Sequence, residues 1–226
     1  MQKYCQASYL VFILSVLACC LAHTFAFATE NEAGMVINHE DFPLRPGLVV
    51  EYSVKSTLEQ MDDTTIKHEY LSETEIQDTL FVKRVTTMSG DVGQTAYFYR
   101  SDEGIIRVPT ISSSEKSLVL KIPLRIGESW EQEDFIGTRS VKIKKHAETI
   151  ETVETPLGKL RCIKVRHRKP GAIDTDEDSF VWVAKRYGIV KIEINRRTSG
   201  NKITKTVITI SEFHDKKSPE DNNGGQ

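Results

Sequence analysis

Apolar and polar side chains alternate in short stretches over most of this sequence. Between Leu48 and Glu59, apolar residues occupy nearly every second position. Successive side chains of a strand point to opposite faces, so this pattern predicts a strand with one buried and one solvated face. The same alternation occurs in Val141–Lys144, Ile163–Arg168 and Val190–Asn195. Further strands are predicted at Leu80–Thr87, Thr95–Arg100, Gly104–Val108, Leu118–Ile122, Phe180–Ala184 and Ile203–Phe213.

A helix competes with a strand in one segment, Ile66–Gln77. Ile66 and Tyr70 are four residues apart, as on one face of a helix, but the flanking threonines and the weak amphipathicity favour a strand. Gly- and Pro-containing turns separate the apolar runs at short intervals, which leaves no room for the long crossovers of parallel strands. The sequence therefore predicts an all-β fold, an antiparallel curved sheet of about ten or eleven strands shaped as an open half-barrel.

Two sequence patterns recur in the same order. Phe42–Gly47 (FPLRPG) resembles Ile122–Gly127 (IPLRIG), 80 residues later. Tyr97–Val108 resembles Val181–Ile192, 84 residues later, with a strand followed by Gly-Ile and further apolar residues in both. The matches predict two copies of one meander, about residues 42–111 and 122–196, joined in one continuous sheet that covers their apolar faces. A chance similarity of apolar strands and Pro/Gly turns is the alternative.

The N-terminus has the three parts of a secretory signal. Lys3 is the only charge before Glu30, and the apolar stretch Tyr9–Leu21 is shorter than the ~20 residues that a membrane-spanning helix needs. Ala26 and Ala28 supply the small residues that a signal peptidase recognises, which predicts cleavage before Thr29. Two alternatives stay open: an uncleaved membrane anchor, and lipidation at Cys19, because Val16–Cys19 loosely resembles a bacterial lipobox.

Composition narrows the function classes. The whole chain carries 30 basic and 32 acidic side chains, which does not favour nucleic-acid binding. Removing residues 1–28 leaves Cys162 as the only one of four cysteines, so no internal disulfide is expected. Residues 29–213 are predicted to form a single all-β domain, and the polar residues 214–226 a disordered tail.

No residue pattern predicts catalysis or a metal site. The histidines lack the spacing of a zinc site, and Asp174–Asp178 lacks the glycine and glutamate of an EF-hand loop, so we interpret it as a solvated acidic hairpin loop. Strand alternation places Cys162 and His167 on opposite faces, against a Cys–His pair. Cys162 is interpreted as structural, with a free thiol or an intermolecular disulfide as the alternative.

Trp130 and Trp182 each lie at or beside the start of a strand. Large aromatic side chains favour the core, so both are predicted to pack there. The alternative is that they line the concave face of the sheet and contact an apolar ligand.

Four segments combine a turn with a neighbouring strand: Phe42–Gly47, Pro123–Gly127 with Trp130, Glu154–Leu160 with Cys162, and Trp182 with Tyr187–Lys191. Together they resemble a family of uncharacterised secreted bacterial proteins, a TapB-like domain of unknown function. The resemblance covers about residues 40–213 and implies a fold similar to the half-barrel of the LolA and LolB lipoprotein carriers. It carries no catalytic residues to transfer, and the helices that fill the concave face of those carriers have no counterpart in the predicted elements.

The sequence thus predicts an exported, non-enzymatic protein of the periplasm or the medium, without cofactor or metal. Two roles stay open. The protein could bind an apolar ligand or lipid on the concave sheet. It could instead be a structural or protein-interaction component of the cell envelope, in which sheet edges pair with a partner.

Overall fold

The computed structural model describes residues 34–58, 64–136, 139–172, 175–197 and 203–216. Residues from Val36 on make up one compact unit. Its strands are β1 (Leu48–Ser56), β2 (Thr65–Ile76), β3 (Thr79–Met88), β4 (Asp91–Ser101), β5 (Gly104–Val108), β6 (Ser117–Lys121), β7 (Ser129–Ile136), β8 (Arg139–Thr155), β9 (Gly158–Ala172), β10 (Thr175–Ala184), β11 (Gly188–Arg197) and β12 (Ile203–Asp215). They form one antiparallel sheet, so the predicted all-β, antiparallel, curved fold is confirmed. Within the described residues, no helix has the length and apolar character to cross a membrane.

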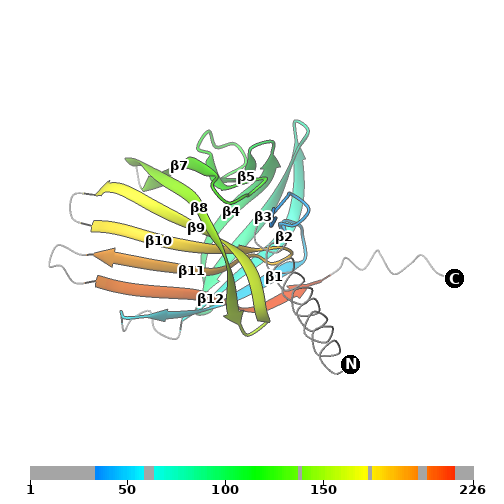
Figure 1. The fold of residues 1–226 in the computed structure, drawn as a ribbon. Coiled ribbons are helices and arrows are strands. Elements are labelled where there is room, and N and C mark those ends of the chain that lie inside the picture. Colours follow the sequence, from blue (N-terminus) through cyan, green and yellow to red (C-terminus); the bar gives the residue numbers. More distant parts are fainter. Residues whose placement is uncertain (1–33, 59–63, 137–138, 173–174, 198–202, 217–226) are drawn as a thin grey trace, which may run out of the picture. The chain divides into compact units, whose positions relative to one another are not determined.

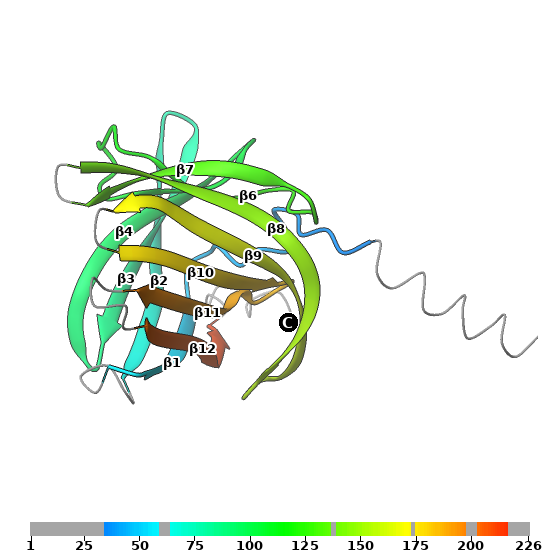
Figure 2. The ribbon, with the colours of Figure 1, turned by 60° about the vertical axis from the view of Figure 1, so that its left-hand side comes forward.

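The sheet consists of two six-strand meanders, β1–β6 and β7–β12. Its order is β6-β5-β4-β3-β2-β1-β12-β11-β10-β9-β8-β7, so the first and last strands of the chain pair with each other in the middle. Figure 1 shows β1 and β12 side by side. The sheet rolls until its two terminal strands, β6 and β7, approach each other, as the turned view in Figure 2 shows. It is therefore more nearly closed than the predicted half-barrel.

The sequence predicted most of these strands but not their number or lengths. The segment in which helix and strand competed is strand β2, as favoured. β7 was not predicted, because Gln132 is a polar residue that lies buried (7% exposed) and interrupts the apolar alternation. β8 extends far beyond the predicted Val141–Lys144. β12 continues to Asp215, two residues beyond the predicted end of the domain, and Lys216 N–H donates to the Gly47 carbonyl at 3.0 Å.

The two PLRxG turns make matching contacts. Gly47 and Gly127 both have positive φ (78° and 84°), a conformation that glycine adopts without steric cost. Gly47 N–H donates to Tyr70 O in β2, and Gly127 N–H donates to Ala147 O in β8, each at 2.8 Å. Both turns therefore join their first strand to the second strand in the same way. The duplication itself stays a prediction.

The inner face of the sheet carries the core. Val54, Val82, Val165 and Ile210, from β1, β3, β9 and β12, are each at most 1% exposed. β-Branched residues suit a pleated, buried surface, which explains why the Val- and Ile-rich stretches became strands. Ala26, Ala28, Cys19 and most of the predicted tail (217–226) lie outside the described residues.

Candidate functional site

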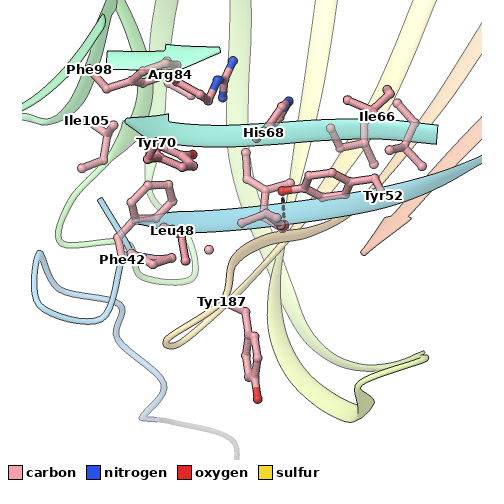
Figure 3. A pocket seen from close by; sticks show the side chains of 17 residues that line it. Phe42, Leu48, Tyr52, Ile66, His68, Tyr70, Arg84, Phe98, Ile105 and Tyr187 are labelled. Carbon is pink, nitrogen blue, oxygen red and sulfur yellow. Dashed lines mark hydrogen bonds between the residues drawn. The ribbon is translucent and has the colours of Figure 1, made fainter. Parts of the chain in front are cut away.

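An apolar cavity of about 130 Å³ lies inside the rolled sheet, beside the β1–β2 hairpin. Most of its lining side chains are aliphatic or aromatic, and they come from both halves of the sheet. Figure 3 shows Phe42, Leu48, Tyr70 and Ile105 gathered at one end of it. The lining residues are Phe42, Pro43, Leu48, Val50, Tyr52, Ile66, His68, Tyr70, Arg84, Phe98, Ile105, Val119, Tyr187, Gly188, Ile189, Ile192 and Ile208.

Two polar side chains in this lining are uncharged. Burial is the main cause that lowers the pKa of His68, to about 3, and the nearby Arg84 cation lowers it further, so the imidazole is neutral at pH 7. Burial also raises the pKa of Tyr52, whose hydroxyl donates to the Ile189 carbonyl at 3.1 Å. The two rings meet edge to face, with centroids 5.2 Å apart. This wall of the cavity therefore presents little polarity to a ligand.

Arg84 is the one charged residue in the lining of the cavity. It follows the buried Val82 by two positions in β3, so both side chains point to the inner face. Its guanidinium carbon lies 4.3 Å from the centroid of the Phe98 ring, a cation–π distance. Its Nε is buried and has no hydrogen-bond partner. A buried donor without a partner costs about 1–3 kcal/mol, so this nitrogen is an anomaly that a ligand could relieve.

A second cavity, of about 420 Å³, also has Arg84 in its wall. Polar side chains dominate this lining, among them Thr86, Gln94 and Arg107. Arg84 therefore stands between an apolar and a polar space.

A third cavity, of about 480 Å³, lies beside the β7–β8 hairpin. Its wall includes Trp130, whose buried Nε1 has no hydrogen-bond partner, and Lys145, whose Nζ lies 5.8 Å from the indole centroid. Lys145 Nζ donates to the Val119 carbonyl of β6 at 2.7 Å. The ammonium thus connects β8 with β6 across the joint between β6 and β7, and we assign it a structural role.

The two tryptophans lie on different faces. Trp130 pairs with Lys145, which pairs with His167 on the inner face, whereas Trp182 pairs with Lys164 and Lys191 on the outer face. Both are buried, at 9% and 4% exposure, as predicted for core packing. Neither lines the apolar cavity. The alternative of a ligand contact on the concave face is wrong for Trp182, which lies on the outer face, and stays a hypothesis for Trp130.

The outer-face tryptophan belongs to a charged cluster. Trp182 Nε1–H donates to Glu151 Oε2 at 2.8 Å, and Lys164 Nζ donates to Glu151 Oε1 at 3.0 Å. Burial alone would raise the pKa of Glu151, but these two hydrogen bonds and the charges of Lys164 and Lys191 lower it. Lys191 Nζ lies 4.3 Å from the Trp182 ring centroid. These groups satisfy one another, which is typical of a structural network.

Cys162 and His167 point to opposite faces of β9, as predicted. The register of β9 on β10 is uninterrupted between them, and Cys162 pairs with Ala184 while His167 pairs with Ser179. Burial raises the pKa of Cys162 to about 12 and is the main cause that lowers the pKa of His167 to about 2. A thiol with this pKa is protonated and unreactive at pH 7.

The acidic stretch differs from the prediction of a hairpin loop. Asp174 lies outside the described residues, whereas Thr175–Asp178 form the start of β10. Asp178 accepts two hydrogen bonds from Arg166, at 2.9 Å and 2.6 Å. Asp178 pairs with Arg168 of β9 and with Asn195 of β11, so it is part of the sheet. The prediction of a loop was wrong because these strands continue beyond the segment in which apolar and polar residues alternate. In the described part of the chain, no cluster of three or more His, Cys, Asp or Glu side chains could hold a metal ion.

Sequence reasoning did not single out Tyr52, His68 or Arg84. Each lies in a strand that the pattern predicted, but alternation alone does not show which faces of distant strands enclose a common space. The sequence around Arg84 gave no signal, because the apolar Phe81 and Val82 occupy both faces of this segment.

No family model and no curated protein match this sequence. Two solved structures resemble its fold. One, from Bacteroides fragilis NCTC 9343, is described as a candidate exported protein with a YmcC-like fold; it has 14% identity and a TM-score of 0.52, covering 76% of this chain and 98% of that one. The other, a candidate lipoprotein from Parabacteroides distasonis ATCC 8503, has 13% identity and a TM-score of 0.46, covering 78% and 99%. The first similarity shows a shared fold across most of the chain.

Proposed function

We propose that this chain is an exported, non-enzymatic binding protein that holds a compact apolar group inside its rolled sheet. The apolar cavity of about 130 Å³ carries the proposal. Its wall of aliphatic and aromatic side chains, with a neutral His68, matches the composition of small-molecule sites.

The volume of the cavity sets the size of the group. An engineered apolar cavity of about 150 Å³ in another protein binds benzene. A cavity of about 130 Å³ therefore suits a single ring or a short branched chain, and a complete acyl chain would need more space. If the ligand is a lipid, we expect only one compact part of it to enter.

Export and the absence of catalysis belong to the same proposal. The predicted signal (1–28) supports export, with release after Ala28 favoured over lipidation at Cys19. The protonated, buried Cys162 and its separation from His167 disfavour thiol catalysis. Mass spectrometry of the protein from its native host tests export: we expect a chain that begins at Thr29, and a diacylglyceryl-modified Cys19 would contradict release.

Toluene is the probe for the cavity. We expect the purified mature protein to bind toluene, seen as chemical-shift changes confined to cavity residues and a raised melting temperature. Ile208→Phe fills the cavity and should abolish the response, whereas Ile203→Phe, on the same strand but 57% exposed, should keep it. Native mass spectra without any bound small molecule, together with no response to toluene, would exclude the proposed function.

The alternative role, an interaction with other envelope proteins, stays a hypothesis. The terminal strands β6 and β7 are the sheet edges that a partner strand would need. They face each other and are bridged by side chains, which leaves less edge for a partner.

A further inference from the structure

Arg84 lies at the border of the apolar cavity, and its guanidinium has no acidic side chain as an ion-pair partner among the described residues. Tyr70 of β2 and Ala96 of β4 are its neighbours in the sheet register, and neither carries a charge. Within the described ranges no carboxylate forms an ion pair with Arg84, and its Nε is buried without a partner. Figure 3 shows the guanidinium beyond the Phe98 ring, at the margin of the group of apolar side chains.

The polar cavity on the other side of Arg84 has room for a solvated anion beside this guanidinium. Of the residues that line it, only Glu115 is acidic, with an exposed side chain, and Arg107 has an interaction of its own. The remaining lining side chains include hydroxyl and amide groups that tolerate a solvated polar group. An apolar space and a polar space thus meet at the Arg84 guanidinium.

We infer that the ligand is a monocarboxylate, whose compact apolar body occupies the apolar cavity and whose carboxylate accepts hydrogen bonds from Arg84. This inference rests on the proposed function, because it assigns the ligand class of the same cavity. A guanidinium presents its N–H donors in a planar fork that matches a carboxylate, and desolvation at the cavity margin strengthens that pairing. The size limit of the cavity restricts the body to about one ring or a short branched chain.

Calorimetric titration with three probes tests this inference. Phenylacetate carries the ring and the charge, phenylacetamide has nearly the same shape without the charge, and toluene has the ring alone. We expect the mature protein to bind phenylacetate about ten-fold or more tightly than phenylacetamide, because only the anion pairs with the guanidinium. Equal affinity for the two would overturn the inference, and toluene binding would then still support the proposed function. Binding of none of the three would exclude the proposed function as well.

Two variants locate the effect. Arg84→Met keeps the unbranched apolar stem of the side chain without its charge and should reduce the phenylacetate preference to about one-fold, with toluene binding retained as proof that the cavity is intact. Lys83→Met removes a charge from the neighbouring position on the opposite face of β3 and should keep the preference. A preference that persists in Arg84→Met would contradict the assignment. If Arg84→Met does not fold, the affinities of the unmodified protein for phenylacetate and phenylacetamide still decide the question.

Discussion

The two joints between the halves of the sheet are held in different ways. At the β1–β12 joint, backbone pairing runs from Leu48–Asp215 to Ser56–Thr206, over a core that includes Tyr52 and Ile210. At the β6–β7 joint, Ser117 of β6 donates to the Glu133 carbonyl of β7, and Lys145 of the neighbouring β8 reaches the Val119 carbonyl of β6. The first joint thus depends on the ladder and the core, and the second on a few polar contacts. We expect the second to open more easily.

The interiors of the two halves differ as well. The third residue after the turn glycine is Val50 in one half and Trp130 in the other. Val50 pairs with His68 and lines the apolar cavity. Trp130 pairs with Lys145, and its larger indole side chain lines the third cavity. The cavity beside Val50 is lined mainly by apolar side chains, whereas the cavity beside Trp130 is lined mainly by charged and polar ones. The equivalent positions of the two halves therefore border spaces of different chemistry.

The largest effect is expected at the β1–β12 joint. Ile210 is fully buried there, so Ile210→Ala should lower the free energy of unfolding by about 2–5 kcal/mol through lost burial and a new cavity. Ile203→Ala, at a site 57% exposed on the same strand, should change it by less than about 0.5 kcal/mol. Urea denaturation measures both. Similar values for the two variants would show that this joint does not depend on its core.

The next effect is expected at the β6–β7 joint. Lys145→Met removes a charged donor from the Val119 carbonyl and should cost about 1.5–3 kcal/mol of unfolding free energy. Hydrogen exchange should accelerate in β6 and β7 and stay unchanged in β1 and β12. Lys144→Met is the control, because its 65% exposed side chain lies 3.9 Å from Glu131 and contributes little. Uniform acceleration in all four strands would contradict an independent second joint.

The stability of the fold should fall at acidic pH, because each half of the sheet holds an uncharged histidine on its inner face. The half-buried His68 and His167 have pKa values of about 3 and about 2, below the value of about 6.5 in an unfolded chain. As the pH falls below about 6.5, the unfolded chain binds protons first, so the stability present at neutral pH is progressively lost. Each histidine should account for about 2 kcal/mol between pH 7 and pH 5.

Single variants separate the two contributions. His68→Leu and His167→Leu should each reduce the stability difference between pH 7 and pH 5 by about 2 kcal/mol, as measured by urea denaturation at the two pH values. Between pH 8 and pH 9 the slope of stability against pH should match that of the unmodified protein. If only one variant has this effect, the other half of the sheet has a wetter interior.

The sequence was sufficient for the fold class but not for the closure or the cavity. Alternation with Thr, Val and Ile identifies strands, because side chains on a pleated surface repeat every two residues. It missed β7, where the buried Gln132 has the character of an exposed residue. Alternation also predicted too short a strand at β8, because polar residues continue this strand beyond the alternating segment.

The candidate site depends on contacts between distant strands. Lys83 and Arg84 are consecutive basic residues in β3, and only the register on β2 and β4 shows that Arg84 faces the interior with Val82. The ladder between β2 and β3 shifts between Tyr70 and Glu73, so counting from the turn would not have placed Arg84 opposite Tyr70. Such bulges follow from the packing of the whole sheet, which local patterns do not contain.

The smallest effect is expected from the second contact of the β6–β7 joint. Ser117 Oγ donates to the Glu133 carbonyl at 2.9 Å, and a neutral hydrogen bond of this kind contributes about 0.5–1.5 kcal/mol. Ser117→Ala should lower the free energy of unfolding by that amount and accelerate exchange in β6 less than Lys145→Met does. The double variant should deviate from additivity, because both contacts hold β6 against the β7–β8 hairpin and the loss of one makes the other easier to break. Strict additivity in urea denaturation would mean that the two contacts act separately, and that β6 and β7 do not open as one unit.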